Sequence, residues 1–230
     1  MQANYVQRLR LKFSKMGPAR FIGHLDLART LERSFNRSQI PIAYTQGFNR
    51  RPRMSLAAAL PLGFTSACEL ADIWLKKELN PEAAREQMQE KMAPGIYVSR
   101  VEVVSLSAPS LQSVTRSAIY SVTLLDAVNE LELRKRIRKA MDADGLPRQR
   151  KRGKGKVKEY DLRPLIINMH VEESMNDLTR LRMELSLEPG KTGRPDEVLS
   201  ELSLDAANAR IHRTELNLFV PAQGHVSCEA

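Results

Sequence analysis

The sequence predicts an α+β fold built from two tandem ferredoxin-like halves, each a βαββαβ unit with an antiparallel sheet. Two observations lead to this prediction. Segments whose apolar residues alternate, as in strands, and segments with helical period follow one another in the same order twice along the chain. A stretch rich in serine and containing a proline, residues 108–116, separates the two series. We therefore expect an N-terminal half at residues 1–107 and a C-terminal half at residues 117–222.

The first half begins with a strand over residues 9–13, where three apolar residues alternate with basic ones. A helix over residues 24–36 follows, with Leu27, Leu31 and Phe35 on one face. Asn80 and Pro81 are a typical helix start, a capping residue followed by proline in the first turn. The other expected elements are strands at 42–44, 55–62, 68–75 and 96–106 and the helix from 81 to 92.

The second half repeats this order. We expect strands at 119–125, 157–162, 165–172, 178–187 and 210–220, and helices at 127–142 and 195–204. The basic segment 148–156 is expected to lie outside regular structure, because Pro147, Gly153 and Gly155 interrupt it.

The positive charge of the chain is concentrated in one place. The 230 residues have a net charge of +9, and residues 148–158 contain seven basic residues and no acidic one, which leaves +2 for the rest. Such a segment attracts nucleic-acid phosphates, although it is also typical of a solvated loop. The residues expected to capture nucleic acid here are Arg148, Arg150, Lys151, Arg152 and Lys154.

A second candidate site is the loop over residues 44–53, in which residues 48–53 hold one aromatic ring, one amide and three arginines. Arginine forks bind phosphate oxygens and an aromatic ring offers a stacking face to a base. The alternative is a solvated loop whose arginines contact only water. We expect Arg50, Arg51 and Arg53 to contact phosphates and Phe48 to stack on a base. Gln46 and Asn49 are expected to form hydrogen bonds to bases or to the nucleic-acid backbone.

His24 is the one candidate catalytic residue, as a general acid or base. It falls on the apolar face of its helix, where a lone histidine is more often a packed residue. The chain has no cysteine triplet for an iron–sulfur cluster, no phosphate-binding glycine loop and no metal-ligand spacing. We therefore expect no cofactor, no metal and no complete active site. No apolar stretch is long enough to span a bilayer and no signal peptide is visible, so we expect a cytoplasmic protein.

Four motifs together resemble one bacterial family. They are His24-Leu25-Asp26-Leu27-Ala28-Arg29, the loop Tyr44-x-Gln46-Gly47-Phe48, Ala59-Leu60-Pro61-Leu62-Gly63, and residues 158–166, KEYDLRPLI. This is the radical-SAM-linked family of uncharacterised domains, encoded beside or fused to a cobalamin-binding radical-SAM protein. Its members often have histidines after the Gly-Phe pair, whereas this chain has Asn49 and Arg51. That difference argues against a metal or general-base role for the loop.

The resemblance implies a radical-SAM partner, and the basic residues suggest RNA or a ribonucleoprotein as the second partner. The first hypothesis is therefore an RNA-binding accessory protein that acts in RNA or ribosome modification. The tandem pattern is also similar in architecture to RNA-processing proteins of CRISPR systems, some of which cleave RNA without metal by means of a histidine near the first helix. The alternatives are thus a metal-independent ribonuclease that uses His24, and a protein-only scaffold for the radical-SAM partner.

Overall fold

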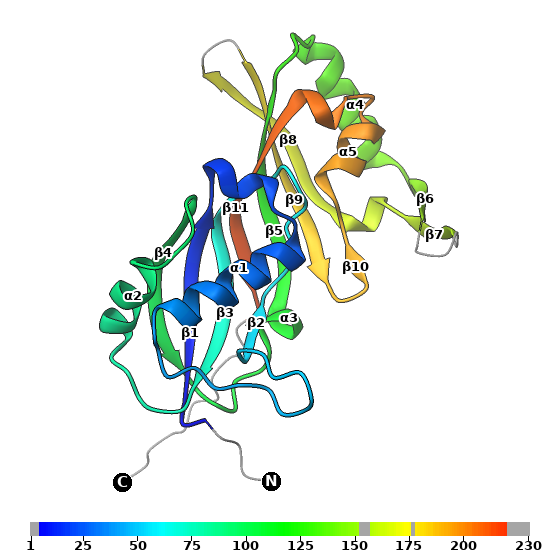
Figure 1. Ribbon diagram of the computed structural model, residues 1–230. Helices are drawn as coiled ribbons and strands as arrows, with labels where there is room; N and C mark the ends of the chain where they lie inside the picture. Colours follow the sequence, from blue (N-terminus) through cyan, green and yellow to red (C-terminus); the bar gives the residue numbers. More distant parts are fainter. Residues whose placement is uncertain (1–4, 152–156, 176–177, 220–230) are drawn as a thin grey trace, which may run out of the picture.

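One large sheet passes through both halves of the chain (Figure 1). The computed structural model describes residues 5–151, 157–175 and 178–219. Within them the sheet has nine strands in the order β10-β9-β5-β11-β3-β1-β4, with β2 also paired to β3 and β8 to β9. The strands are β1 (Gln7–Lys15), β2 (Met54–Leu56), β3 (Thr65–Leu75), β4 (Ile96–Val104), β5 (Thr115–Leu124), β8 (Ile166–Met175), β9 (Leu178–Glu188), β10 (Lys191–Thr192) and β11 (Ala209–Leu218).

The helices are few: α1 (His24–Arg37), α2 (Pro81–Gln89), α3 (Leu111–Val114), α4 (Glu130–Asp142) and α5 (Pro195–Glu201). Capping side chains mark the starts of α2, α3 and α4, whereas α1 and α5 have none. The Asn80 side-chain oxygen accepts hydrogen bonds from the backbone N–H groups of Glu82 and Ala83, and Asn129 caps α4 in the same way. The prediction of a mixed α+β fold with antiparallel pairing is confirmed.

The two halves show the same arrangement of strands. In the first half β1 lies between β3 and β4, and β2 pairs with β3. In the second half β5 lies between β9 and β11, and β8 pairs with β9. Within the described strands only β3 and β11 pair in parallel, and their two pairs join the halves: Thr65 opposite His212, and Ser66 opposite Arg213.

Each half has its own hydrophobic core. In the first, α1 and α2 bury their apolar faces against β1, β3 and β4. In the second, α4 and α5 do so against β5, β8 and β9. Leu60 and Phe64 belong to the first half of the sequence but are buried in the second core. The segment between β2 and β3 therefore ties the halves together.

Several expected elements are corrected by the structure. The strand expected at 55–62 is limited to β2, because the chain then turns to bury Leu60 in the second core. The strand expected at 42–44 is reduced to isolated bridges at Ile42 and Tyr44. The separating stretch 108–116 contains the short helix α3, capped by Ser110, and the first residues of β5. The end of the last expected strand, Val220, lies outside the described residues.

The basic segment is also corrected. Arg148–Lys151 does not lie outside regular structure: it belongs to β6 (Pro147–Lys151), which forms an antiparallel hairpin with β7 (Val157–Asp161). The two glycines expected to break the segment, Gly153 and Gly155, lie between these strands, outside the described residues. We call β6 and β7 the basic hairpin.

Candidate nucleic-acid interface

The loop between α1 and β2 is closed at its base by backbone hydrogen bonds. The N–H of Thr45 donates to the carbonyl of Arg51 at 2.8 Å, and the N–H of Arg51 donates to the Thr45 hydroxyl at 3.1 Å. Gly47 has a φ of +128°, a conformation that other residues rarely adopt. The sequence thus builds a short closed loop over residues 45–51, which we call the arginine loop.

The side chains of the arginine loop are exposed. Phe48 is fully exposed, and Gln46, Asn49, Arg50 and Arg51 are exposed as well. None of these five side chains makes a hydrogen bond or ion pair with another described residue. An exposed ring beside unpaired guanidinium groups is the chemistry that a single-stranded nucleic acid requires. The structure therefore brings these predicted site residues together on one exposed loop.

A small cavity of about 280 Å³ lies along the inner side of this loop. Arg50 lines it together with Lys76, which follows β3 and has its Nζ 5.5 Å from the centre of the Tyr44 ring. The Tyr44 hydroxyl donates to Asn36 of α1 at 2.7 Å, which fixes the loop against the helix. Lys76 is a cationic residue that the sequence analysis missed. It directly follows β3, and nothing in the sequence there indicates that the arginine loop lies beside it.

Arg53 does not belong to this exposed group. Its guanidinium lies 4.6 Å from the centre of the Tyr5 ring and 5.0 Å from that of Trp74. Cation–π contacts of this kind stabilise the fold. Arg53 is therefore half-buried beside two aromatic rings, unlike the exposed Arg50, and its contact with phosphate stays a prediction.

The described arginines of the basic hairpin are neutralised by α5. Arg150 donates to both carboxylate oxygens of Glu197, at 3.0 and 2.6 Å, and Arg148 forms an ion pair with Glu201. The pKa of Arg150 is raised, mainly by its hydrogen bond to Glu197. The hairpin is therefore less positive than its sequence suggests. Arg152 and Lys154 lie outside the described residues, and of Lys151 the structure describes only the backbone.

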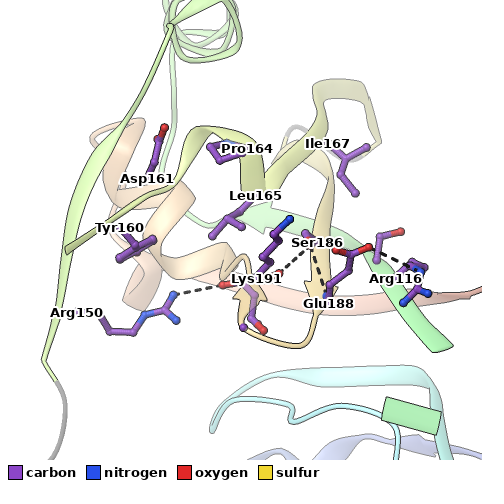
Figure 2. Close-up of a pocket in the computed structure, with 13 residues that line it drawn as sticks. Arg116, Arg150, Tyr160, Asp161, Pro164, Leu165, Ile167, Ser186, Glu188 and Lys191 are labelled. Atoms are coloured by element: carbon purple, nitrogen blue, oxygen red, sulfur yellow. Dashed lines mark hydrogen bonds and ion pairs between the residues drawn. The ribbon is translucent and has the colours of Figure 1, made fainter. Parts of the chain in front are cut away.

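A cavity of about 720 Å³ lies beside the basic hairpin (Figure 2). We call it the hairpin pocket. Arg150 enters it from β6 with its guanidinium 4.7 Å from the centre of the Tyr160 ring. Arg116 lies on the opposite side, 3.7 Å from Glu188, and exposed Lys191 has no ion-pair partner among the described residues. Both an aromatic ring and an available cation thus line this pocket.

His24 lies apart from the arginine-loop side chains, at the start of α1. It is only half-buried, and it lines a third cavity, of about 370 Å³, with residues of the second half. The pKa of His24 is lowered, mainly by burial. The negative charge of Glu69 acts in the other direction and raises this pKa. His24 therefore faces the junction of the two halves, and its role as a packed residue or as a general acid or base stays a prediction.

A buried polar cluster lies behind this cavity, and the sequence analysis missed it. Arg213 of β11 donates to Glu69 of β3 at 2.9 Å and to the Tyr120 hydroxyl at 3.1 Å, and the two charged side chains are 0% and 3% exposed. Lys15 is fully buried and donates to the carbonyl of Phe64, and burial lowers its pKa. Charged residues within strands that are otherwise apolar could have indicated this cluster in the sequence, because a buried charge needs a partner.

Cys68 of β3 belongs to the same buried region. Burial is the main reason that its pKa is raised to about 11, so the group is a thiol at neutral pH. The residues that the structure describes contain no group of three histidine, cysteine, aspartate or glutamate side chains placed to hold a metal ion. In the same part of the chain, no helix combines the length and apolar character that crossing a membrane requires.

The fold and its surfaces define a basic α+β protein with an exposed aromatic and arginine loop. The chain belongs to the family of uncharacterised proteins conserved in bacteria (DUF2344), whose family model matches residues 8–195. No curated protein matches the chain.

Two solved structures are similar to the chain at low identity. They are a Cbf5-Nop10-Gar1 complex, with a TM-score of 0.48 and 9% identity, and the archaeal box H/ACA sRNP Nop10-Cbf5 complex, with a TM-score of 0.44 and 10% identity. Each match covers 92% of this chain, which spans about half the length of the matched chains, 50% and 48% respectively.

Proposed function

We propose that this protein is a cytoplasmic RNA- or ribonucleoprotein-binding accessory of a radical-SAM enzyme, acting in RNA or ribosome modification. The observation that carries the proposal is the arginine loop, with Phe48 fully exposed beside the unpaired Arg50 and Arg51. An exposed phenyl ring has no role in folding, whereas stacking on a base is sequence-tolerant and favourable. The radical-SAM partner rests on the resemblance of the four sequence motifs.

The two halves are part of the same proposal. We interpret residues 1–107 and 117–222 as two ferredoxin-like units that share one sheet. The repeated arrangement of strands supports this interpretation, because β1 lies between β3 and β4 as β5 lies between β9 and β11. The basic hairpin is then an insertion in the second unit, between α4 and β8.

Binding is favoured over the alternative of RNA cleavage. A metal-free ribonuclease needs a second acid or base near its histidine. The ionisable groups near His24 are already engaged: Glu69 pairs with Arg213, and the Tyr120 hydroxyl accepts from Arg213. The alternative of a protein-only scaffold is also less favoured, because it would give the exposed ring of Phe48 and the arginines beside it no nucleic acid to bind.

The salt dependence of RNA binding tests the electrostatic part of the proposal. The variant Arg50→Ala/Arg51→Ala loses two exposed cations, so the slope of log K against log salt should fall by roughly 1.4 for single-stranded RNA, about 0.7 for each phosphate contact. The control Arg100→Ala/Arg134→Ala removes the same charge from exposed ion pairs on β4 and α4 and should leave the slope unchanged. Fluorescence anisotropy at several salt concentrations measures both slopes. Equal slopes in the wild type and the loop variant would contradict phosphate contact by the arginine loop.

The same salt titration measures how much the basic hairpin contributes to RNA binding. Because Glu197 already neutralises Arg150, the variant Arg150→Ser/Lys151→Ser/Arg152→Ser/Lys154→Ser should reduce the slope by less than four phosphate contacts would require.

A further inference from the structure

Helix α4 carries five cations within six residues. Residues 134–139 read RKRIRK, and Ile137 is the one of them that is buried in the second core. The side chains of the other five are exposed. This group of cations is separate in the chain from both the arginine loop and the basic hairpin.

Two of the five cations are matched by carboxylates one turn earlier in the helix. The guanidinium of Arg134 lies 3.4 Å from Glu130, and that of Arg136 lies 3.5 Å from Glu132. Residues four apart lie side by side on a helix, so these are intrahelical ion pairs. The charges of Arg134 and Arg136 are therefore balanced within α4.

The other three cations have no such partner. Lys135, Arg138 and Lys139 make no ion pair or hydrogen bond with another described residue. One turn before them the helix has Leu131, Arg134 and Lys135 in place of carboxylates. Like charges four residues apart destabilise a helix. The helix thus retains a repulsion that a bound anion would relieve.

The three unpaired cations share one face of α4. At 100° per residue they fall within about 100° of one another, opposite the face that Leu133 and Ile137 bury. Asp142 follows on the same exposed face, so three cations and one carboxylate leave it a charge of +2. We call Lys135, Arg138 and Lys139 the basic face of α4.

Grooves lie on both sides of the basic face. One, of about 340 Å³, lies between α4 and β8; Arg138 lines it, and no described carboxylate does. The other, of about 450 Å³, lies between α4 and the end of α5 and is lined by Lys135 and Lys139. The two carboxylates that line it, Glu132 and Glu201, are already paired with arginines. Both grooves therefore present positive charge to a ligand.

These features select a ligand with several negative charges along its length. The cations are spread over an exposed helix and its two flanking grooves, and α4 contains no aromatic ring on which a base could stack. Contacts of this kind position a nucleic acid through its phosphates and do not read its sequence.

We propose that the basic face of α4 binds the phosphate backbone of RNA. The choice of RNA as the polyanion rests on the proposed function. Figure 1 shows α4 at the opposite end of the molecule from the arginine loop, so one RNA would contact the protein at two separate places. The phosphates belong either to a single strand or to a base-paired stem, which share this chemistry.

The salt dependence of binding to two RNAs, a single strand and a hairpin without overhang, tests the proposal. The variant Lys135→Gln/Arg138→Gln/Lys139→Gln removes the three cations, and glutamine has a similar helix propensity. Three lost contacts should lower the slope of log K against log salt by roughly 2.1 for a single strand or 2.7 for a stem, about 0.7 and 0.9 for each phosphate. The RNA whose slope falls is the form that α4 binds.

The matched control removes the same charge elsewhere. Arg29→Gln/Lys91→Gln/Arg100→Gln takes three cations from exposed ion pairs on α1, after α2 and on β4, and should leave both slopes unchanged. Fluorescence anisotropy measures all the slopes, and thermal unfolding checks that each variant folds.

A second variant tests the basic face without removing a cation. Leu131 is 75% exposed and lies one turn before Lys135, so the glutamate of Leu131→Glu should pair with that lysine. The slope should fall by roughly 0.7–0.9, the value of one phosphate contact. The variant should unfold at or above the wild-type temperature, because an opposite-charge pair at this spacing stabilises a helix.

The possible outcomes separate this proposal from the proposed function. Unchanged slopes with both RNAs in the triple α4 variant, while the wild type binds RNA, overturn the basic face and leave the proposed function in place. A lower slope in that variant but not in Arg50→Ala/Arg51→Ala supports the basic face and removes the arginine loop from the interface. A wild type that binds neither RNA overturns both proposals and leaves an acidic protein as the partner that the charge of α4 fits.

Discussion

Replacing Glu69 with alanine should lower the free energy of unfolding by about 3–5 kcal/mol, the cost of leaving a buried charge without its partner. Arg213 is completely buried, and in Glu69→Ala it keeps only the neutral Tyr120 hydroxyl and the Ala59 carbonyl as hydrogen-bond acceptors. The pair also joins the halves, because Glu69 lies on β3 and Arg213 on β11. Urea unfolding monitored by circular dichroism measures the loss.

Two further variants separate the buried charge from a general effect of substitution. Glu102→Ala removes the partner of Arg100 in an exposed ion pair and should lower the free energy of unfolding by no more than about 1 kcal/mol. The double variant Glu69→Leu/Arg213→Met should recover most of the stability, because no lone charge then remains buried. A loss in Glu69→Ala no larger than that in Glu102→Ala would contradict this interpretation of the junction.

Phe48→Ala should weaken RNA binding by about 5- to 150-fold, because one base stacked on an aromatic ring contributes about 1–3 kcal/mol. The ring is fully exposed, so the variant should unfold at the wild-type temperature. Fluorescence anisotropy with single-stranded RNA measures the affinity, and thermal unfolding checks the fold.

Arg53→Ala is the control on the same segment. Arg53 lies between Tyr5 and Trp74, so its loss should cost about 1 kcal/mol of stability and leave the RNA affinity nearly unchanged. If Phe48→Ala binds RNA as the wild type does while Arg53→Ala does not, the assignment of roles within this segment is wrong.

Local patterns in the sequence were sufficient for most of the fold. The period of apolar residues located α1, β3, β5 and β9, and Asn80 with Pro81 marked the start of α2, because these signals depend on neighbours in the chain. The arginine loop was found in the same way, from residue types that are close in sequence.

What the sequence could not supply depends on residues far apart in it. The basic segment forms strands whose described arginines bind Glu197 and Glu201 of α5, about 50 residues away. Arg53 looked equivalent to Arg50 until Tyr5 and Trp74 were placed around it. Likewise the buried pair of Glu69 and Arg213 requires β3 and β11 to lie side by side, and these two residues are 144 positions apart in the sequence.

Ultraviolet crosslinking in cells, with the attached peptides mapped by mass spectrometry and the RNA sequenced, tests the proposed RNA-binding function most directly. We expect RNA on peptides that contain Phe48. The bound RNA is compared between cells that have the radical-SAM partner and cells that lack it. Recovery of the protein without RNA, or with RNA only on peptides of α2 or β4, would contradict it.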